Sequence, residues 1–406
     1  MRSTFVIISQ VYVPDPASAG QHIADAASEM AGRGYRTVVY TSARGYEDPG
    51  VTYPARESRD GVEIRRLPLS SFGKGSIAVR LVAQGFFVLF ATARALFTRG
   101  LCGVMVSTSP PFGGIAGALI SKLRRVPLKY WIMDLNPDQM VALKKLPPDA
   151  VPVRVFDALN RVALRQASDV VVLDRFMAER VNAKLPVAEK LTVLPPWPHE
   201  TAVLDIPHDE NGFRRRHVPE GKFVVMYSGN HSPSNPITVL LDAAERLKDD
   251  ARLLVLCVGG GAGKKEVEER IARGAANVRS LPYQPLGQLG LSLSSADVHV
   301  VTVGSGMVGI VHPCKVYDAM AVSRPILLIG PDPSHVSDLI RNNGIGWHVL
   351  PGDVAAAERA LREMMALEPG QLRAMGQRAA ELVSRSLGRE LLCGRFCDVL
   401  QRGCAP

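Results

Sequence analysis

Short apolar runs rich in valine and isoleucine alternate with amphipathic segments along the first half of this 406-residue chain. Runs of this length are typical of strands that are buried on both faces of a parallel sheet. Apolar residues at helical spacing in residues 20–34, ending at two glycines, predict a helix between the first two runs. The strands are expected at residues 4–13, 35–42, 103–109, 127–134 and 169–174. This alternation predicts βαβ units.

A segment rich in proline and polar residues, 193–213, interrupts the alternation and shows no period, as expected for an inter-domain linker. The alternation then resumes, and from about Asp353 the chain is helical in character. Strands are expected at residues 222–229, 252–261, 277–282, 296–303, 325–329 and 346–350, and helices at 235–250 and 264–274. The sequence therefore predicts an α/β protein with two doubly wound, Rossmann-like domains, at 1–195 and 221–385, a linker at 196–220 and a C-terminal segment at 386–406.

Composition narrows the class of protein. The chain is 47% hydrophobic and 21% charged, and its net charge of +9 favours anionic partners such as phosphates or acidic lipids. The basic residues are scattered, with Arg214–Arg216 the tightest group, so we expect no nucleic-acid partner. The six cysteines lack the spacing of a zinc site or a disulfide framework, which suits a cytoplasmic protein. The apolar N-terminus is expected to form a strand, since it lacks the features of a signal peptide.

The stretch from Arg80 to Arg94 has an uncharged core of about 13 residues, whereas a helix needs roughly 20 to span a bilayer. Two interpretations stay open for it. It is either a buried helix or a helix at a membrane interface.

Four places have residues suited to a ligand. Gly20 precedes a predicted helix, where backbone N–H groups bind anions; the alternative is an ordinary turn. Gly229, Asn230 and His231 end a predicted strand, where small and polar groups suit a ligand site. The alternative is that they form a turn and a helix cap. Asp134 ends another strand and could bind hydroxyls or act as a base; the alternative is a capping cluster. Gly259, Gly260 and Gly261 allow close backbone approach, yet match neither GxGxxG nor a Walker A loop, so a tight turn remains open.

Lys315 stands near the start of a predicted helix inside an apolar stretch, and Asp318 follows one turn later. A cation there opposes the helix dipole, so a polyanion in front of the helix explains it better. A nucleotide diphosphate would offer a phosphate to the lysine and ribose hydroxyls to the carboxylate. The alternative is a surface ion pair, which the apolar flanks disfavour.

The residues from Pro313 to Pro325, with "YSGNHS", "DLNPD" and "VGIVHPCK", resemble the retaining family-4 glycosyltransferases. The closest likeness is to the bacterial branch that assembles colanic acid, O-antigen and exopolysaccharide. The resemblance implies a GT-B fold whose two domains face a central cleft. The C-terminal domain would hold a nucleotide-sugar donor, the N-terminal domain an acceptor, and the last helix would cross back to the first domain. It also implies that Lys315 meets the donor diphosphate, that Asp318 replaces the usual ribose-binding glutamate, and that the Gly20 loop approaches the donor phosphates.

Two departures from the family pattern change the expected site. Ile310 stands where many members have an acidic residue, so sugar recognition falls to the backbone amides of residues 307–311, namely Met307, Val308, Gly309, Ile310 and Val311. The usual basic pair of the second domain is replaced by Asn230 and His231. We expect Lys315, His231 and Asp134 to be catalytic, with His312 as an alternative to His231.

The expected activity is hexosyl transfer, with retention, from a nucleotide sugar to a saccharide acceptor. A lipid-linked acceptor is expected, and a soluble acceptor stays open. No D-x-D pair is present, so no metal and no cofactor beyond the donor are expected, and the choice between UDP and GDP stays open. The protein would be cytoplasmic, with peripheral contact to the inner face of the plasma membrane left open. The alternatives are a nucleotide-sugar epimerase of the same fold, a nicotinamide-dependent oxidoreductase, which the missing fingerprint disfavours, and a non-catalytic partner subunit.

Overall fold

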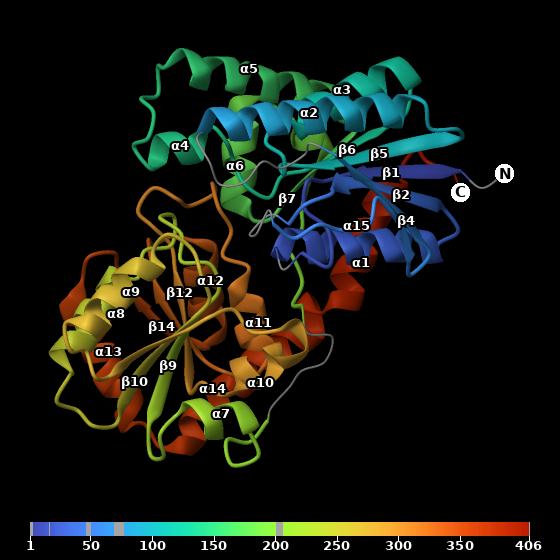
Figure 1. Cartoon of the computed structure of the whole chain (residues 1–406). Coiled ribbons are helices and arrows are strands. Elements are labelled where there is room, and N and C mark those ends of the chain that lie inside the picture. Colours follow the sequence, from blue (N-terminus) through green and yellow to red (C-terminus); the bar gives the residue numbers. More distant parts are fainter. Residues whose placement is uncertain (1–2, 16, 46–49, 69–76, 200–205, 406) are drawn as a thin grey trace. The chain divides into compact units, whose positions relative to one another are not determined.

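The computed structural model describes residues 3–15, 17–45, 50–68, 77–199 and 206–405, and their side chains outside 77–81 (Figure 1). The chain divides into two compact units. The first contains the residues up to Pro196 together with those from Arg389 onward, and the second is Trp197–Gly388. Each unit is an α/β domain built on its own sheet.

The first unit contains an eight-stranded sheet in the order β3-β4-β2-β1-β5-β6-β7-β8. Its neighbours pair in parallel except β3 and β4, which form an antiparallel edge. The strands are β1 (Thr4–Ile8), β2 (Arg36–Ser42), β3 (Arg56–Arg59), β4 (Val62–Leu67), β5 (Leu101–Ser107), β6 (Leu128–Trp131), β7 (Asp169–Val172) and β8 (Leu191–Val193). Strands β1 and β5 are buried nearly throughout, as a parallel sheet with helices on both faces requires.

Helices cover both faces of this sheet. Three of them, α2, α3 and α5, lie over one face, while α1 and α15 lie against the other (Figure 1). The helices of this unit are α1 (Ser18–Gly32), α2 (Ile77–Leu96), α3 (Gly113–Arg124), α4 (Asp138–Ala142), α5 (Val151–Gln166), α6 (Arg175–Lys184) and α15 (Arg389–Gln401). Among the residues that the structure describes, no helix is both long and apolar enough to cross a membrane.

The second unit contains a fully parallel six-stranded sheet in the order β11-β10-β9-β12-β13-β14. The strands are β9 (Phe223–Ser228), β10 (Leu253–Val258), β11 (Val278–Leu281), β12 (Val298–Thr302), β13 (Ile326–Ile329) and β14 (Gly346–Val349). The helices are α7 (Gly212–His217), α8 (Thr238–Arg246), α9 (Lys264–Ala272), α10 (Leu289–Ser294), α11 (Lys315–Ala321), α12 (His335–Asn343), α13 (Val354–Ala366) and α14 (Pro369–Leu382).

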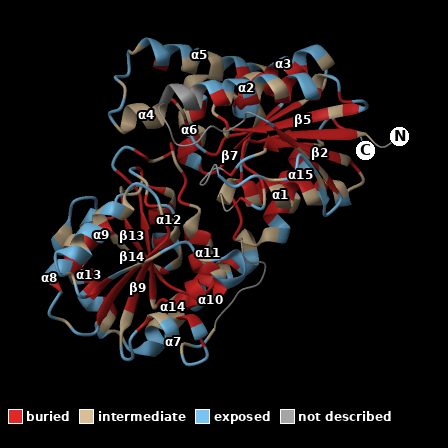
Figure 2. Ribbon diagram, in the orientation of Figure 1, coloured by how far each residue is buried: buried red, intermediate tan, exposed pale blue. Residues whose placement is uncertain are grey.

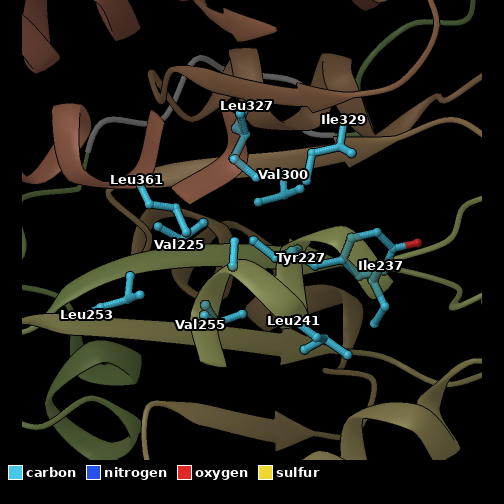
Figure 3. Close-up of a cluster of buried hydrophobic side chains, with 14 of the residues drawn as sticks. Val225, Tyr227, Ile237, Leu241, Leu253, Val255, Val300, Leu327, Ile329 and Leu361 are labelled. Carbon is cyan, nitrogen blue, oxygen red and sulfur yellow. The ribbon is translucent and has the colours of Figure 1, made fainter. Parts of the chain in front are cut away.

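Strand β9 contributes to both cores of this sheet. Val225 and Tyr227 pack into one hydrophobic cluster (Figure 3), whereas Val224 and Met226 pack into another. Successive side chains of a strand point to opposite faces, so burial on both sides explains the uninterrupted apolar run that marks this strand in the sequence. The central strands of both sheets are buried almost throughout, whereas the edge strands β3, β8, β11 and β14 are more exposed (Figure 2).

The predicted fold class is confirmed, and each of the runs named above contains a strand. Three local expectations differ from the structure. The hairpin of β3 and β4 was not predicted because β3 has the charged sequence RESR. The expected linker 196–220 contains α7, whose Phe213 is buried in a core cluster of the second unit. Gly20 lies within the first turn of α1 and not before it.

The C-terminal segment is held on the first unit by ion pairs, hydrogen bonds and aromatic packing. Arg33, which directly follows α1, pairs with Asp398 of α15, with 2.7 Å between nitrogen and oxygen. The buried Lys129 ammonium donates to the Arg402 carbonyl, 2.5 Å away, and to Asp169. The Phe396 ring lies 4.3 Å, centroid to centroid, from that of Trp131 on β6. These contacts make α15 an integral part of the domain that begins about 380 residues earlier.

Replacing Phe396 with alanine should destabilise the first unit. The side chain is fully buried, so its removal leaves a cavity and should lower the free energy of unfolding by about 3–5 kcal/mol. Leu391→Ala on the same helix is the matched control, because Leu391 is exposed and should change the free energy by under about 1 kcal/mol. Urea unfolding followed by tryptophan fluorescence measures both. Equal effects of the two substitutions would contradict the packing described.

Candidate functional site

The strand order of the second sheet defines where a ligand can bind. The chain leaves β9 toward β10 on one side, and β12 on the other side of β9 begins the remaining half of the sheet. In open parallel sheets, ligands bind beyond the carboxyl ends of the strands at such a reversal. Two segments lie there, Gly229–His231 after β9 and residues 303–311 after β12. They contain most of the residues that the sequence singled out.

The loops after β9 and β10 are in direct contact through their backbones. A Cβ on Gly259 would lie 2.0 Å from the carbonyl oxygen of Gly229, and one on Gly261 would lie 2.1 Å from Oδ1 of Asn230. Both glycines also have positive φ, at 134° and 112°, a region that other residues rarely adopt. Three backbone hydrogen bonds join the loops: Gly229 N–H to Val258, His231 N–H to Gly260, and Gly263 N–H to His231, at 2.7–2.9 Å. The glycines are therefore needed for this interlocking.

Two side chains fasten the same loops. The Tyr227 hydroxyl donates to the Asn230 carbonyl, 2.9 Å away. The Lys264 ammonium donates to the carbonyl oxygen of Gly259, also 2.9 Å away, and to that of Leu281. A rigid backbone surface results at the carboxyl edge of the sheet. Neither residue was among the predicted site residues, although Tyr227 directly precedes the "SGNHS" segment and Lys264 is the first residue of α9.

Lys315, the first residue of α11, points its ammonium onto the face of Tyr227. Its Nζ lies 3.5 Å from the centroid of that ring and about the same distance from where a Cβ on Gly229 would stand. This nitrogen is buried, and within the described residues it has no hydrogen-bond partner. Burial lowers the pKa of Lys315 to about 7. A cation–π contact of this kind contributes only about 0.5–2 kcal/mol, so the charge is left largely uncompensated.

His231 is a second buried nitrogen base beside the same ring. Its Nδ1 lies 3.2 Å from the Gly260 carbonyl, and its ring centroid lies 4.8 Å from that of Tyr227. Burial lowers the pKa of His231 to about 4, so the imidazole is neutral at pH 7. The carbonyl beside Nδ1 favours the tautomer with its proton there, which leaves the buried, unpartnered Nε2 as an acceptor. A neutral imidazole in this tautomer offers an anion no proton from Nε2. The expectation that His231 is catalytic stays a prediction.

Asp318 lies one helical turn after Lys315 on α11. Its Oδ1 accepts a hydrogen bond from the backbone N–H of His199, 2.8 Å away, so the carboxylate fixes the start of the second unit. This contact was not predicted. The contact of Asp318 with ribose hydroxyls stays a prediction.

The backbone amides expected to recognise a sugar are only partly available. Met307 N–H donates to the Gly304 carbonyl, and the N–H groups of Ile310 and Val311 donate to the Met307 carbonyl, at 3.0–3.2 Å. Met307 and Ile310 are also buried in the domain. Three of the five expected N–H donors thus already form hydrogen bonds within the loop itself. Val308 is also in contact with another group. Gly309 has a φ of 71°, which suits glycine.

His312, the alternative to His231, lies in a hydrogen-bonded chain of rings. Its Nε2 is 2.7 Å from the Tyr317 hydroxyl, which is 2.8 Å from Nε2 of His335. All three rings lie within about one helical turn of Lys315 or at the start of α12. The chain orders α11 and the segment before it, since a hydroxyl that both donates and accepts is fully satisfied.

Gly20 and Asp134 belong to the first unit. A Cβ on Gly20 would lie 3.1 Å from the backbone of Tyr12, so the glycine allows α1 to pack closely on the segment after β1. The Gly20 N–H already donates to the Ala17 carbonyl, 2.9 Å away, which weakens the expectation that it binds a phosphate. Asp134 follows β6, its side chain is exposed, and its backbone N–H donates to Thr108. Asp138, the first residue of α4, forms an ion pair with Lys184, with 2.9 Å between oxygen and nitrogen.

Comparison with known proteins assigns a family to each unit. Residues 19–197 match the model of the glycosyl transferase 4-like domain, and residues 209–382 match that of glycosyl transferases group 1. The chain is 27% identical over 345 residues to a probable glycosyltransferase, WbjE of Pseudomonas aeruginosa, covering 83% of this chain and 82% of the relative. It is 24% identical over 404 residues to WcaI of Escherichia coli K12, named a putative colanic acid biosynthesis glycosyl transferase, covering 95% and 97%.

Solved structures agree in fold. The crystal structure of HepE from Anabaena in complex with UDP and glucose matches with a TM-score of 0.74 at 15% identity, covering 99% of this chain and 100% of that one. At this identity the likeness establishes the fold alone. The two family matches together span most of the chain, and each falls on one of the parallel-sheet α/β domains. The chain therefore belongs to the glycosyltransferases of GT-B fold.

Proposed function

We propose that this glycosyltransferase moves a hexosyl group from a nucleoside-diphosphate sugar to a lipid-linked saccharide during cell-surface polysaccharide synthesis, with retention at the anomeric carbon. The observation that carries the proposal is the buried Lys315 ammonium, which lies on Tyr227 at the carboxyl edge of the second sheet and has no hydrogen-bond partner among the described residues. A diphosphate supplies the missing negative charge. The name of WcaI and the UDP-bound state of HepE support a polysaccharide product and a first choice of UDP as donor nucleotide.

In the proposed reaction, the main requirement is to stabilise the negative charge on the leaving diphosphate. The bond between the anomeric carbon and the β-phosphate oxygen breaks, and the acceptor hydroxyl oxygen forms the new bond to that carbon. The hydroxyl proton passes to the departing phosphate oxygen, so no carboxylate nucleophile is required. Negative charge grows on the diphosphate as it leaves, and a preorganised cation aimed at it lowers the barrier most. Lys315 has this role, and the reaction as proposed uses no metal and no further cofactor.

Lys315 meets this demand because it is buried before the donor arrives. In the free protein its pKa is near 7, so a substantial fraction is neutral at physiological pH. An adjacent diphosphate favours the ammonium form and raises that pKa. The interaction therefore strengthens as the leaving group gains charge, which is the condition for catalysis over mere binding.

The activity is tested by incubating the protein with UDP-, GDP- and dTDP-sugars, with and without a polyprenyl-diphosphate-linked saccharide. We expect acceptor-dependent release of nucleoside diphosphate and, by NMR, a product with the anomeric configuration of the donor. Lys315→Met should lower kcat by roughly 100–1,000-fold. Lys265→Met is the control, since the Lys265 side chain is 82% exposed. Isomerised nucleotide sugar without transfer would indicate an epimerase, and nucleotide binding without turnover would indicate a partner subunit; either result contradicts the proposal.

Lys315→Met should also stabilise the protein in a pH-dependent way. The folded pKa of Lys315, about 7, lies below its ordinary value of 10.5, so between these values the unfolded chain binds more protons. Below pH 10.5, folding therefore requires Lys315 either to lose its proton or to bury its charge. The resulting loss of stability is largest below about pH 7. The variant should be more stable than the wild type by about 1–3 kcal/mol at pH 7, and the difference should shrink toward pH 10. A variant less stable at pH 7, measured by urea unfolding, would mean that Lys315 is a structural residue.

Asp318→Asn separates the structural contact of Asp318 from the proposed ribose contact. The amide oxygen of asparagine still accepts from His199 N–H, while the charge that strengthens bonds from ribose hydroxyls is lost. The wild type should bind UDP roughly tenfold or more tightly than 2′,3′-dideoxy-UDP, and the variant should bind the two with similar affinity. Isothermal titration calorimetry measures these affinities. An unchanged preference for the ribonucleotide in the variant would exclude Asp318 from the ribose contact.

A further inference from the structure

Helix α2 has two apolar faces, although packing on the sheet requires only one. The buried face consists of residues spaced four apart, namely Ala83, Phe87, Ala91 and Ala95. A second apolar series is exposed and runs along the helix into the turn after it, namely Val82, Phe86, Leu89 and Phe97. Leu89 is 62% exposed and Phe97 is 87% exposed, so neither contributes much to folding.

The two neighbouring helices repeat this arrangement. Exposed apolar residues recur at helical spacing on α3, at Leu119 and Leu123, and on α5, at Val151, Val155 and Val162. The three helices pack side by side over one face of the first sheet, and exposed stretches mark their outer surfaces (Figures 1 and 2). Among the described residues, nine of the sixteen exposed large hydrophobic side chains belong to this group. We call these nine residues, with the outer surfaces of α2, α3 and α5, the helical face.

The helical face is also basic. Exposed cationic side chains stand among its apolar residues or at the helix ends, namely Arg94, Lys122, Arg125, Arg154 and Arg165. Within the described side chains of these three helices, the one acidic residue is Asp157, and it is neutralised by Arg161, 2.9 Å away, and by Lys184, 2.6 Å away. The face thus combines apolar side chains with an excess of positive charge.

The occupant must satisfy both features. A second copy of this chain, related by two-fold symmetry, would bring the same basic residues opposite each other, and like charges across an interface are unfavourable. An anionic bilayer offers acyl chains to the apolar residues and phosphate headgroups to the basic ones. Since no described helix is apolar enough to cross a membrane, the contact would lie in the plane of the interface.

We propose that the helical face of α2, α3 and α5 binds the surface of a membrane that contains anionic phospholipid. This goes beyond the transfer reaction, because it requires neither a donor nor an acceptor. It would hold the first domain at the surface where a lipid-linked acceptor resides. Phe86 and Phe90, whose rings stack with centroids 6.1 Å apart, would insert together at the level of the headgroups.

Co-sedimentation with vesicles tests the proposal without any nucleotide. The full chain should bind vesicles of phosphatidylcholine and phosphatidylglycerol in equal parts, bind vesicles of phosphatidylcholine alone far more weakly, and dissociate as salt is raised. The double variant Leu89→Ser/Phe97→Ser should lose binding to both. The double variant Arg94→Gln/Arg154→Gln should bind the anionic vesicles roughly 25-fold more weakly, at about fivefold for each basic residue near the surface.

The matched control is Leu350→Ser/Arg273→Gln, which removes an exposed apolar and an exposed basic side chain from the second unit. It should bind as the wild type does. All variants change exposed residues, and thermal melting should show that they fold. Undiminished vesicle binding by the helical-face variants would overturn the proposal. So would a wild-type dimer that these substitutions dissociate while vesicles are not bound, since the face would then be an interface between copies. Transfer to a water-soluble acceptor analogue, measured in parallel, reports the proposed function independently.

Discussion

A buried ammonium without a matching anion is the constraint around which the second domain is built. Lys315 places Nζ 3.5 Å from the centre of the Tyr227 ring, and no hydrogen bond within the described residues compensates it. Leaving a charge in this state is unfavourable, as the lowered pKa of Lys315 shows. Buried charges without a partner are typical of sites where a ligand of opposite charge binds. The unfavourable environment of Lys315 in the free protein is therefore what we expect of a binding site.

The scaffold around this charge is rigid because backbone meets backbone. The loops after β9 and β10 interlock through Gly259 and Gly261, and Tyr227 both supplies the ring beneath the ammonium and holds the Asn230 carbonyl. Tyr227 itself belongs to a packed core cluster (Figure 3). The position of the cation is therefore set by the core of the sheet, and the surrounding loops add little freedom. Preorganisation of this kind favours stabilisation of charge that develops during a reaction.

Much of the fold could be predicted from the chain, because strands buried on both faces must be apolar throughout. Every predicted strand was found for this reason. Strands β3, β4 and β8 were missed, because β3 and β4 carry charged residues and β8 is a three-residue edge strand that is only partly buried. The position of Lys315 was also predictable, since a lysine in an apolar stretch requires an explanation. Its resting place on Tyr227 was not, because which ring a side chain meets depends on packing between β9 and α11. The tautomer of His231 and the hydrogen bond from His199 to Asp318 likewise depend on tertiary contacts that no local pattern encodes.

The most direct measurement is a crystal structure of the protein with bound UDP. The account predicts that a β-phosphate oxygen lies about 3 Å from Nζ of Lys315, at hydrogen-bonding distance, with the loops after β9 and β10 unchanged. UDP bound elsewhere, or bound with the ammonium still resting on Tyr227 and no phosphate oxygen beside it, would contradict the account.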